Sequence, residues 1–271
     1  MSKRPLLRWA GSKRSSIESL LSWMPSQIQT YIEPFCGSAA ISFHVNAKIC
    51  VLSDINERLI NFYEQCRDSS SELYAEYRSL ETNKEAYYTI RDKFNNEKDD
   101  FVSAVYFYYL NRNCFNGLYR TNKNGEFNVP YSDSRIGSPL SREEFVSLCA
   151  RLKRFILRKG DFEATVNDFL GPESFFFIDP PYAVSRRAPF TEYDAKDFNA
   201  ADLNRLLKCL EAIDDSGGKF LFTYDGASEA KLLQRPSWSI ASVRVRRNIS
   251  GFAGGRRSAS EIVISNYRLD S

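Results

Sequence analysis

Apolar residues along this chain form two kinds of pattern, continuous short runs and repeats every three or four positions. The two patterns alternate along the chain, which predicts an α/β fold. Runs of about four to eight apolar residues, bounded by glycine, proline or charged residues, are typical of buried strands. One run begins at Tyr31 and leads into a turn of small residues, and the next ends in a carboxylate, Asp54. This is how a doubly wound sheet opens. Strands are predicted from residue 31 and over 48–54, 154–159, 175–179, 219–224, 240–246 and 261–267.

Helices are predicted where apolar residues return every three or four positions. Residues 15–24 predict a helix, because Ser15 and Glu18 have the spacing of a capping box. Residues 101–110 are rich in aromatic side chains and predict a buried helix, and residues 123–126 predict a hairpin turn. The clearest helix is amphipathic. Its apolar face consists of Leu203, Leu206, Leu207, Leu210 and Ile213.

The alternation of strands and helices is interrupted once. Between residues 56 and 148 the pattern consists of helical segments and polar, aromatic loops, and the alternation then resumes. The simplest organisation is one sheet domain, formed by residues 1–55 and 149–271, with an inserted module at 56–148.

The composition indicates the class of protein and the compartment in which we expect it. The 271 residues are 43% hydrophobic and 26% charged, which is typical of a globular protein. No run approaches the roughly 20 apolar residues of a membrane span, and residues 1–5 lack the apolar core of a signal peptide. The six cysteines include no Cys-x-x-Cys pair, as in reduced proteins. We therefore expect a cytoplasmic protein without a membrane segment.

The single histidine, His44, excludes several chemistries. No Gly-x-Ser-x-Gly elbow accompanies it, and Val45 and Asn46 follow where a zinc deaminase motif needs a glutamate. Because His44 lies in an apolar run, a packed structural histidine is favoured over a catalytic one. No metal site is expected.

Positive charge is unevenly distributed. The net charge is only +3, but basic residues gather in segments without acids. Such patches suit a phosphate backbone, since each neutralised phosphate releases a counterion, although a solvated surface explains any single patch equally well. The patches are Lys3, Arg4, Arg8, Lys13 and Arg14; Arg151, Lys153, Arg154, Arg158 and Lys159; and Arg244, Arg246, Arg247, Arg256 and Arg257.

The sharpest chemical signal is Asp179-Pro180-Pro181-Tyr182, directly after the apolar strand at 175–178. Ligands of an open α/β sheet bind at the carboxyl ends of its strands, where these residues are expected. The two prolines fix the backbone, so that a carboxylate and a carbonyl point to one place, and Tyr182 offers a stacking face for a base. An ordinary proline turn is the alternative.

This tetrapeptide resembles motif IV of the amino-group methyltransferases, which use S-adenosylmethionine to modify adenine, cytosine or protein glutamine. Four more segments resemble the bacterial and phage DNA adenine methylases, the Dam family. They are a cofactor motif at 6–13 (LLRWAGSK), motif I at 33–37 (EPFCG), a target-recognition segment at 110–130 and a basic segment at 246–250 (RRNIS). The resemblance covers residues 6–264. It implies a class I methyltransferase (Rossmann-like) fold whose insert is a mostly helical target-recognition domain.

The resemblance implies a cofactor site for S-adenosylmethionine. Trp9 and Lys13 would contact the cofactor, Phe35 would line its pocket, and Gly37 would allow close approach of the backbone. Asp54 would accept hydrogen bonds from the ribose, and Asp179 would face the reactive group. From the residues alone, Gly37 also fits a plain turn, Asp54 a helix N-cap and Trp9 a core aromatic.

The resemblance also implies the reaction, which is methylation of N6 on an adenine flipped out of duplex DNA, within GATC. Asp179 and the carbonyl of Pro180 would each accept one amine hydrogen, while Pro181 stiffens the turn and Tyr182 stacks on the base. We expect a monomer that acts on double-stranded DNA. Asp179→Ala should nearly abolish methylation and leave DNA affinity largely intact.

Sequence recognition falls to the insert. By resemblance, Arg120 would contact guanine, Leu118 a thymine methyl, and Phe115 and Asn116 the space that the flipped base vacates. From the residues alone, Leu118 and Phe115 also fit a core, and Arg120 a phosphate clamp. The stretch 132–135 departs from the basic, aromatic pattern of the relatives, which leaves DNA contacts there open. Further DNA contacts are expected from Arg8, Arg91, Asn122 and Pro130.

Three alternatives accompany this interpretation. The enzyme could methylate N4 of cytosine, or a protein glutamine, or the chain could be a catalytically silent DNA-binding relative. The arginines and aromatic residues of the insert argue against a protein substrate. The complete cofactor and catalytic motifs argue against a silent relative.

Overall fold

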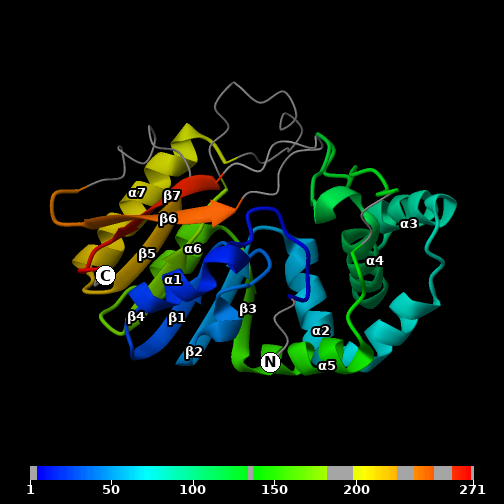
Figure 1. Ribbon diagram of the computed structural model, residues 1–271, viewed down its shortest axis with the longest axis horizontal. Coiled ribbons are helices and arrows are strands. Elements are labelled where there is room, and N and C mark those ends of the chain that lie inside the picture. The colour runs from blue at the N-terminus through cyan, green and yellow to red at the C-terminus, as the bar shows by residue number, and fades with distance from the viewer. Residues whose placement is uncertain (1–4, 134–136, 182–197, 225–234, 247–257, 270–271) are drawn as a thin grey trace. The chain divides into compact units, whose positions relative to one another are not determined.

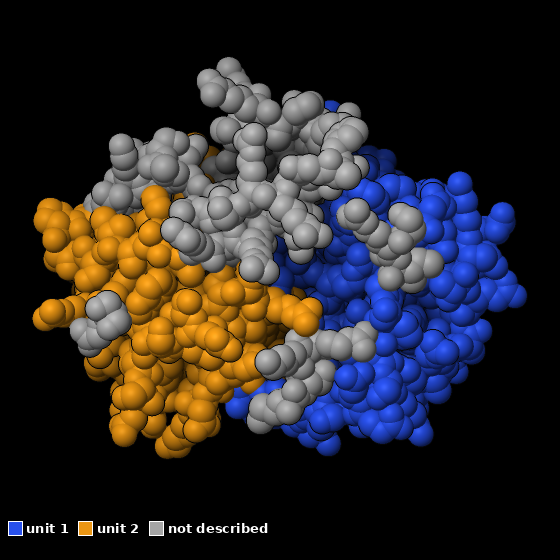
Figure 2. All heavy atoms as spheres, in the orientation of Figure 1, with its two compact units in different colours: residues 1–12, 54–159, 184–197 blue, residues 13–53, 160–183, 198–271 orange. Residues whose placement is uncertain are grey.

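The computed structural model describes residues 5–133, 137–181, 198–224, 235–246 and 258–269. The chain divides into two compact units (Figures 1 and 2). Unit 1 comprises Met1–Ser12, Asp54–Lys159 and Val184–Asp197, and unit 2 comprises Lys13–Ser53, Gly160–Ala183 and Phe198–Ser271. Each unit is therefore assembled from segments that lie far apart in the sequence.

The sheet contains the strands β1 (Ile28–Glu33), β2 (Ala47–Asp54), β3 (Phe155–Lys159), β4 (Ser174–Ile178), β5 (Lys219–Tyr224), β6 (Ser239–Arg246) and β7 (Ser258–Ser265). Their order is β3-β2-β1-β4-β5-β7-β6 (Figure 1). Strand β1 runs parallel to β2 and β4, and β4 runs parallel to β5. Strand β7 runs antiparallel to both β5 and β6. The order reverses at β1, which confirms the predicted doubly wound α/β sheet.

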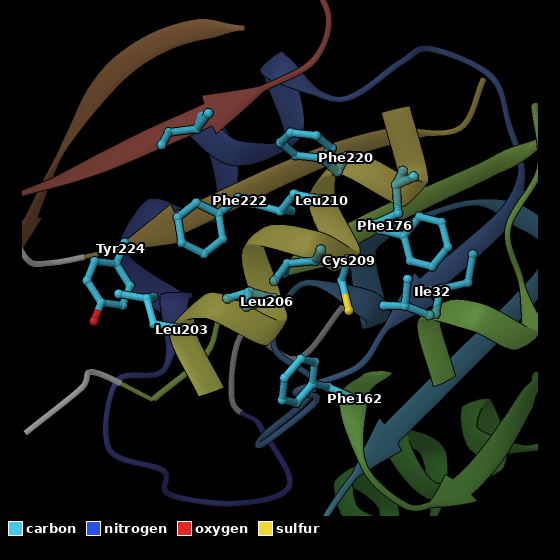
Figure 3. Packing of buried hydrophobic residues seen from close by; sticks show 14 of the residues in the cluster. Ile32, Phe162, Phe176, Leu203, Leu206, Cys209, Leu210, Phe220, Phe222 and Tyr224 are labelled. Carbon is cyan, nitrogen blue, oxygen red and sulfur yellow. The ribbon is translucent and has the colours of Figure 1, made fainter. Parts of the chain in front are cut away.

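The core of unit 2 lies between the sheet and helix α7 (Ala200–Asp215). All residues of β4 are buried, because β4 is a central strand with β1 and β5 on its two sides. The apolar face of α7 packs on this region, which confirms the predicted amphipathic helix (Figure 3). The cluster joins Leu203, Leu206, Cys209, Leu210 and Ile213 of the helix to Phe176, Phe220 and Phe222 of the strands.

Parallel strands place their carboxyl ends at one edge of the sheet. At this edge β1 ends in Glu33, β4 is followed by Asp179, and β5 ends at Tyr224. Because β7 is antiparallel to β5, Ile262 in the middle of β7 pairs with Tyr224, the last residue of β5. The residues of β7 before Ile262 therefore extend past the end of β5, and Glu261 lies at this edge.

The described part of unit 1 is mostly helical. Helices α2 (Glu57–Ser79), α3 (Lys84–Asn96) and α4 (Asp100–Asn113) begin after the capping side chains of Asn56, Asn83 and Asp99. Helix α5 (Arg142–Ala150) begins with a capping box. The aromatic stretch 101–110 lies in α4 and is largely buried, as predicted. Within the described ranges, every helix is too short or too polar to cross a membrane.

The helix predicted over 15–24 is wrong at its start. Lys13–Ser16 form a 3-10 turn, η1, and α1 spans Ile17–Trp23. Ser16 occupies the N-cap without a side-chain capping bond, so the predicted capping box of Ser15 and Glu18 does not form. The turn buries Lys13 and Ser16 and leaves Ser15 exposed, which puts Ser15 one residue too early to cap the helix.

The prediction of a packed His44 is also wrong, since its side chain is exposed. His44 ends the 3-10 turn η2 (Ser42–His44). Ser42 and Phe43 of the same turn and Val45 after it are buried, whereas the His44 side chain faces outward. The apolar run around His44 therefore correctly predicts that its neighbours are buried, but it does not predict the exposure of the imidazole.

Candidate functional site

Asp179 follows β4 and is anchored through one of its two carboxylate oxygens. Its Oδ1 accepts a hydrogen bond of 2.8 Å from Thr223 Oγ1 of β5 and lies 2.7 Å from the Lys13 ammonium nitrogen. Among the described residues, both donors to this carboxylate bind Oδ1. Pro180 is buried and Pro181 is exposed, and their rings fix the backbone that carries Asp179. Within the described parts of the chain, Oδ2 is therefore the oxygen left for other partners.

Lys13 connects two acids, Asp179, whose side chain is 19% exposed, and Glu261, which is buried. Its ammonium nitrogen also lies 3.2 Å from Oε2 of Glu261 on β7, and the Lys13 and Glu261 side chains are each 4% exposed. Charges this deep in a protein are stable only when they are paired. Lys13, predicted as a cofactor contact, is therefore bound to the acids of two different strands.

Burial and charge act against each other in this group. Burial raises the pKa of the Asp179 carboxyl, while Lys13 and the Thr223 hydrogen bond lower it and Glu261 adds to the rise. Burial alone would lower the pKa of the Lys13 ammonium, but Asp179 and Glu261 outweigh burial and raise it. The ammonium therefore stays protonated at neutral pH. With both acids ionised, the three groups carry a net negative charge.

A further buried carboxylate, Glu33, ends β1. Its Oε2 accepts a 2.9 Å hydrogen bond from the Tyr31 hydroxyl and another from the Ser42 hydroxyl. Burial, followed by the charge of Glu33, raises the pKa of Tyr31 well above its usual value, so the phenol remains a neutral donor. Gly37, in the turn after β1, has φ +44°, a left-handed conformation that favours glycine. The turn therefore presents backbone without a side chain.

Phe35 packs within an aromatic cluster of unit 2. Its ring lies 5.1 Å from that of Phe162 and 6.1 Å from that of Phe198, between ring centroids. Asp161 caps helix α6 (Phe162–Asp168) by accepting the N–H of Glu163. The turn after β1 therefore has an apolar surface next to it, formed by these rings, and the polar N-terminus of α6 lies beside them.

Two of the predicted cofactor residues, Trp9 and Asp54, belong to unit 1. Asp54 Oδ1 accepts the backbone N–H of Asn56 at 3.0 Å, and Asn56 is itself the N-cap of α2. Asp54 is therefore not the N-cap. The Trp9 ring stacks on Tyr119 at 6.0 Å between centroids and is partly exposed, so it is not a core aromatic.

The hairpin turn predicted at 123–126 is present. Thr121 and Phe127 form an antiparallel bridge across it. Asn122 Oδ1 accepts the backbone N–H groups of Asn124 at 2.9 Å and Glu126 at 3.0 Å. Asn122, predicted to contact DNA, thus builds the turn with its side-chain oxygen.

Arg120, at the base of this hairpin, is held from across it. Its Nε donates to Oδ1 of Asn128 at 2.8 Å, and the Asn128 N–H donates to the Arg120 carbonyl at 3.1 Å. The side chain is partly exposed. One neutral amide therefore orients this guanidinium.

Arg8, another predicted DNA contact, is enclosed by the recognition segment. Its Nη1 donates to the carbonyls of Arg112 at 3.1 Å and Cys114 at 3.5 Å. Its backbone N–H and carbonyl both bind the Asn111 side-chain amide, at 3.0 and 2.7 Å. A Cβ atom at Gly117 would lie 2.3 Å from Cβ of Arg8, so this approach requires glycine. Arg8 thereby ties the first segment of unit 1 to the end of α4.

The other predicted DNA contacts differ in exposure. Phe115 is 42% exposed, which is not a core position, and Asn116 beside it has φ +55°. Leu118 is partly exposed, and Pro130 is exposed, with its carbonyl accepting the Phe115 N–H at 2.9 Å. Arg91 on α3 is partly buried over an aromatic ring of its own helix.

Some predicted residues cannot be placed. Tyr182, the last residue of the tetrapeptide, lies outside the described residues. The same holds for residues 134 and 135 of the stretch 132–135 and for residues 247–250 of the late basic segment.

Sequence reasoning missed three polar residues that the structure brings into unit 2. Glu261 and Thr223 contact the Lys13–Asp179 pair, and Asp161 caps α6 beside the aromatic cluster. The sequence could have indicated Glu261, because an acidic residue directly precedes the apolar run IVI of a predicted strand. Asp161 follows its strand closely, much as Asp54 ends β2. A threonine inside an apolar strand carries no comparable signal.

Comparison with known proteins identifies related chains. Residues 9–249 match the family described as D12 class N6 adenine-specific DNA methyltransferase. A type II methyltransferase of Methanocaldococcus jannaschii is 33% identical over 98% of this chain and 100% of its own length. The DNA adenine methylase of Escherichia coli strain K12 is 31% identical over 96% of this chain and 94% of its own length. The DNA N-6-adenine-methyltransferase of Escherichia phage P1 is 31% identical over 96% of this chain and 35% of its own length.

Proposed function

Since this chain belongs to the D12 class of N6 adenine-specific DNA methyltransferases, we propose that it methylates adenine within GATC in duplex DNA. The target base is flipped out, because N6 of a stacked and paired adenine cannot reach a buried carboxylate. The methyl donor is S-adenosylmethionine, the cofactor that membership of this family implies. The observation that carries the proposal is Asp179, anchored through Oδ1 at the carboxyl end of β4.

The residues of unit 2 fit this cofactor. When bound, S-adenosylmethionine supplies an electrophilic methyl group on a positively charged sulfur. When Asp179 and Glu261 are both ionised, their charges outnumber that of Lys13, which suits the positive sulfur. Gly37, in its left-handed turn, leaves room for close approach to the backbone, and the ring of Phe35 offers an apolar surface.

Asp179 and Pro180 prepare the amine for attack. The exocyclic amine of adenine is a weak nucleophile, because its lone pair is delocalised into the ring. Asp179 and the carbonyl of Pro180 each accept one amine hydrogen, which favours a pyramidal nitrogen with its lone pair free. Transfer is then a direct displacement without a covalent enzyme intermediate, and the protein contributes positioning and electrostatics. Tyr182 stacks on the flipped base.

The target-recognition role is proposed for the insert, residues 56–148. Arg120 contacts a guanine edge and Leu118 a thymine methyl, which their partial exposure supports. Phe115 and Asn116 occupy the space that the base vacates, a role supported by the exposure of Phe115 at 42%. The held guanidinium of Arg120 suits a bidentate contact, because its fork is already oriented.

One assay tests the reaction and the sequence together. The purified protein is incubated with methyl-labelled S-adenosylmethionine and duplexes that contain or lack GATC, and the DNA is digested to nucleosides. We expect labelled N6-methyladenine from the GATC duplex alone. Labelled N4-methylcytosine, or label in protein, would contradict the adenine reaction. Equal labelling of adenine in both duplexes would contradict the GATC site only.

A further inference from the structure

The proposed reaction gives Glu261 of unit 2 no role beyond its charge. Glu261 stands among apolar residues of β7, where its side chain is 4% exposed and its Oε2 lies 3.2 Å from the Lys13 ammonium nitrogen. A buried ion pair of this kind is weak evidence for stability, because desolvation opposes its Coulomb attraction. The contact therefore requires another explanation.

That explanation lies in how the carboxylate of Asp179 is oriented. Oδ1 receives two donors, the Lys13 ammonium at 2.7 Å and the Thr223 hydroxyl at 2.8 Å. Rotation of the carboxyl group about its Cβ–Cγ bond would break both contacts. The direction of Oδ2 is therefore set by where Lys13 and Thr223 are held. Thr223 is fixed within β5, whereas Lys13 reaches Asp179 through a side chain with several rotatable bonds.

We propose that Glu261 is a positioning residue, which holds the Lys13 ammonium against Oδ1 of Asp179 and so keeps Oδ2 for the amine hydrogen. The inference rests on the role proposed for Asp179. A lysine bound to one carboxylate loses one charged partner when it changes its rotamer, whereas Lys13, held between β7 and the end of β4, would lose two. Glu261 acts on the substrate only through Lys13 and Asp179.

The charges around Asp179 give this arrangement a signature. The described groups that face its carboxylate are Lys13 from η1, Thr223 from β5 and Glu261 from β7. Burial raises the pKa of Asp179 and Glu261 raises it further, whereas Lys13 and Thr223 lower it. Removing the charge of Glu261 should therefore move the titration of Asp179 to lower pH. Removing the hydroxyl of Thr223 should move it to higher pH.

The test compares Glu261→Gln, Thr223→Val and the wild type as full-length proteins. Glutamine keeps an acceptor for Lys13 but lacks the charge, and valine keeps the shape of threonine. Single-turnover methylation of a GATC duplex is measured against pH. In the free protein, the carboxyl carbon of Asp179 is titrated by NMR with 13C-labelled aspartate and assigned through Asp179→Asn. A matched control, Glu211→Gln, removes an acid that pairs with Arg235 elsewhere in unit 2.

We expect opposite shifts from the two variants. In Glu261→Gln the acid limb of the rate profile and the Asp179 titration move down by roughly half a pH unit, and the maximal rate falls about threefold. In Thr223→Val both move up by a similar amount. Glu211→Gln leaves both in place. A wild-type rate at every pH in Glu261→Gln, with an unmoved Asp179 titration, would overturn the proposal.

A shorter acid at the same position covers the case in which Glu261→Gln does not fold. Glu261→Asp keeps the charge but withdraws it from Lys13, so the single-turnover rate should fall about tenfold at all pH values, with unchanged duplex affinity. A wild-type rate in this variant would overturn the positioning role. If the wild type methylates no adenine, the proposed function fails, whereas the NMR titration still tests Glu261. If the wild type does methylate adenine but the Asp179 titration does not shift as expected in the variants, only the inference about Glu261 is wrong.

Discussion

The side chains for which we propose functional roles are held in different ways in the two units. In unit 2, Lys13 and Asp179 are held by other ionisable side chains and by a hydroxyl. In unit 1, Arg8 and Arg120 are held by backbone carbonyls and neutral amides. A change in the first group alters the charge that its partners experience, whereas a change in the second leaves neutral groups behind. Substitutions around Asp179 should therefore affect one another and depend on pH. Substitutions in the recognition segment should act independently, residue by residue.

The largest effect should come from breaking the charged centre itself. Asp179→Ala removes the acceptor for the amine and leaves Lys13 with Glu261 as its remaining acid. The single-turnover rate should fall by about a thousandfold, while affinity for a GATC duplex changes by less than about threefold. Asp215→Ala, at an exposed position at the end of α7, is the control and should keep both values. Normal turnover by Asp179→Ala would remove the proposed mechanism.

Breaking the recognition side should change selectivity and not chemistry. Arg120→Ala should lower discrimination at guanine by about 10- to 100-fold, measured as kcat/KM on GATC against duplexes with that base replaced. The maximal rate on GATC should change much less. Arg142→Ala, an exposed arginine at the start of α5, serves as the matched control. If Arg120→Ala weakened binding to all duplexes equally, Arg120 would be a phosphate contact.

The enclosure of Arg8 can be tested with a matched pair of glycines. Gly117 and Gly125 both have positive φ, +66° and +80°, so alanine at either position costs about 1 kcal/mol of backbone strain. At Gly117 the new Cβ would also lie 2.3 Å from Cβ of Arg8, whereas at Gly125 no heavy atom lies within 4 Å. Urea unfolding should therefore show Gly117→Ala to be less stable than Gly125→Ala by about 1–3 kcal/mol. Equal losses would mean that Arg8 moves aside without cost.

The smallest effect is expected from Asn128, which holds Arg120 within the hairpin. Asn128→Ala removes the side-chain oxygen that accepts from Arg120 Nε at 2.8 Å, and it leaves the longer contact of Arg120 Nη2 with the Asn128 backbone carbonyl at 3.5 Å. Guanine discrimination should fall about fivefold, in keeping with a net contribution of about 1 kcal/mol. Asn128→Asp restores an acceptor and should recover discrimination even if overall duplex affinity drops. Failure of aspartate to recover it would show that Asn128 acts on DNA directly.

The sheet was largely predictable, because its central strands are continuous apolar runs with sharp ends. The range predicted for β5 agrees with the structure, and those for β2 and β4 differ by one residue at each changed end. Strand β7 begins three residues before its predicted start. Its first residues, 258–260, are small and pair with β6, and small residues give no apolar signal.

The site was predictable only in part. The position of Asp179 follows from local sequence, since a strand and two prolines surround it. The partners of Asp179 do not, because Lys13, Thr223 and Glu261 lie far apart in the chain and meet only through the strand order. Local reading also placed a capping box at Ser15, because spacing alone cannot show that a 3-10 turn precedes the helix.

The direction of β7 has a practical consequence. Register pairs Tyr224 with Ile262 and Leu221 with Ser265, so β7 leads away from the edge that carries Asp179. The chain that follows Ser265 accordingly emerges at the amino-terminal ends of the parallel strands. A fluorophore or affinity handle attached there would lie at the edge of the sheet opposite to Asp179, away from the proposed methyl-transfer centre.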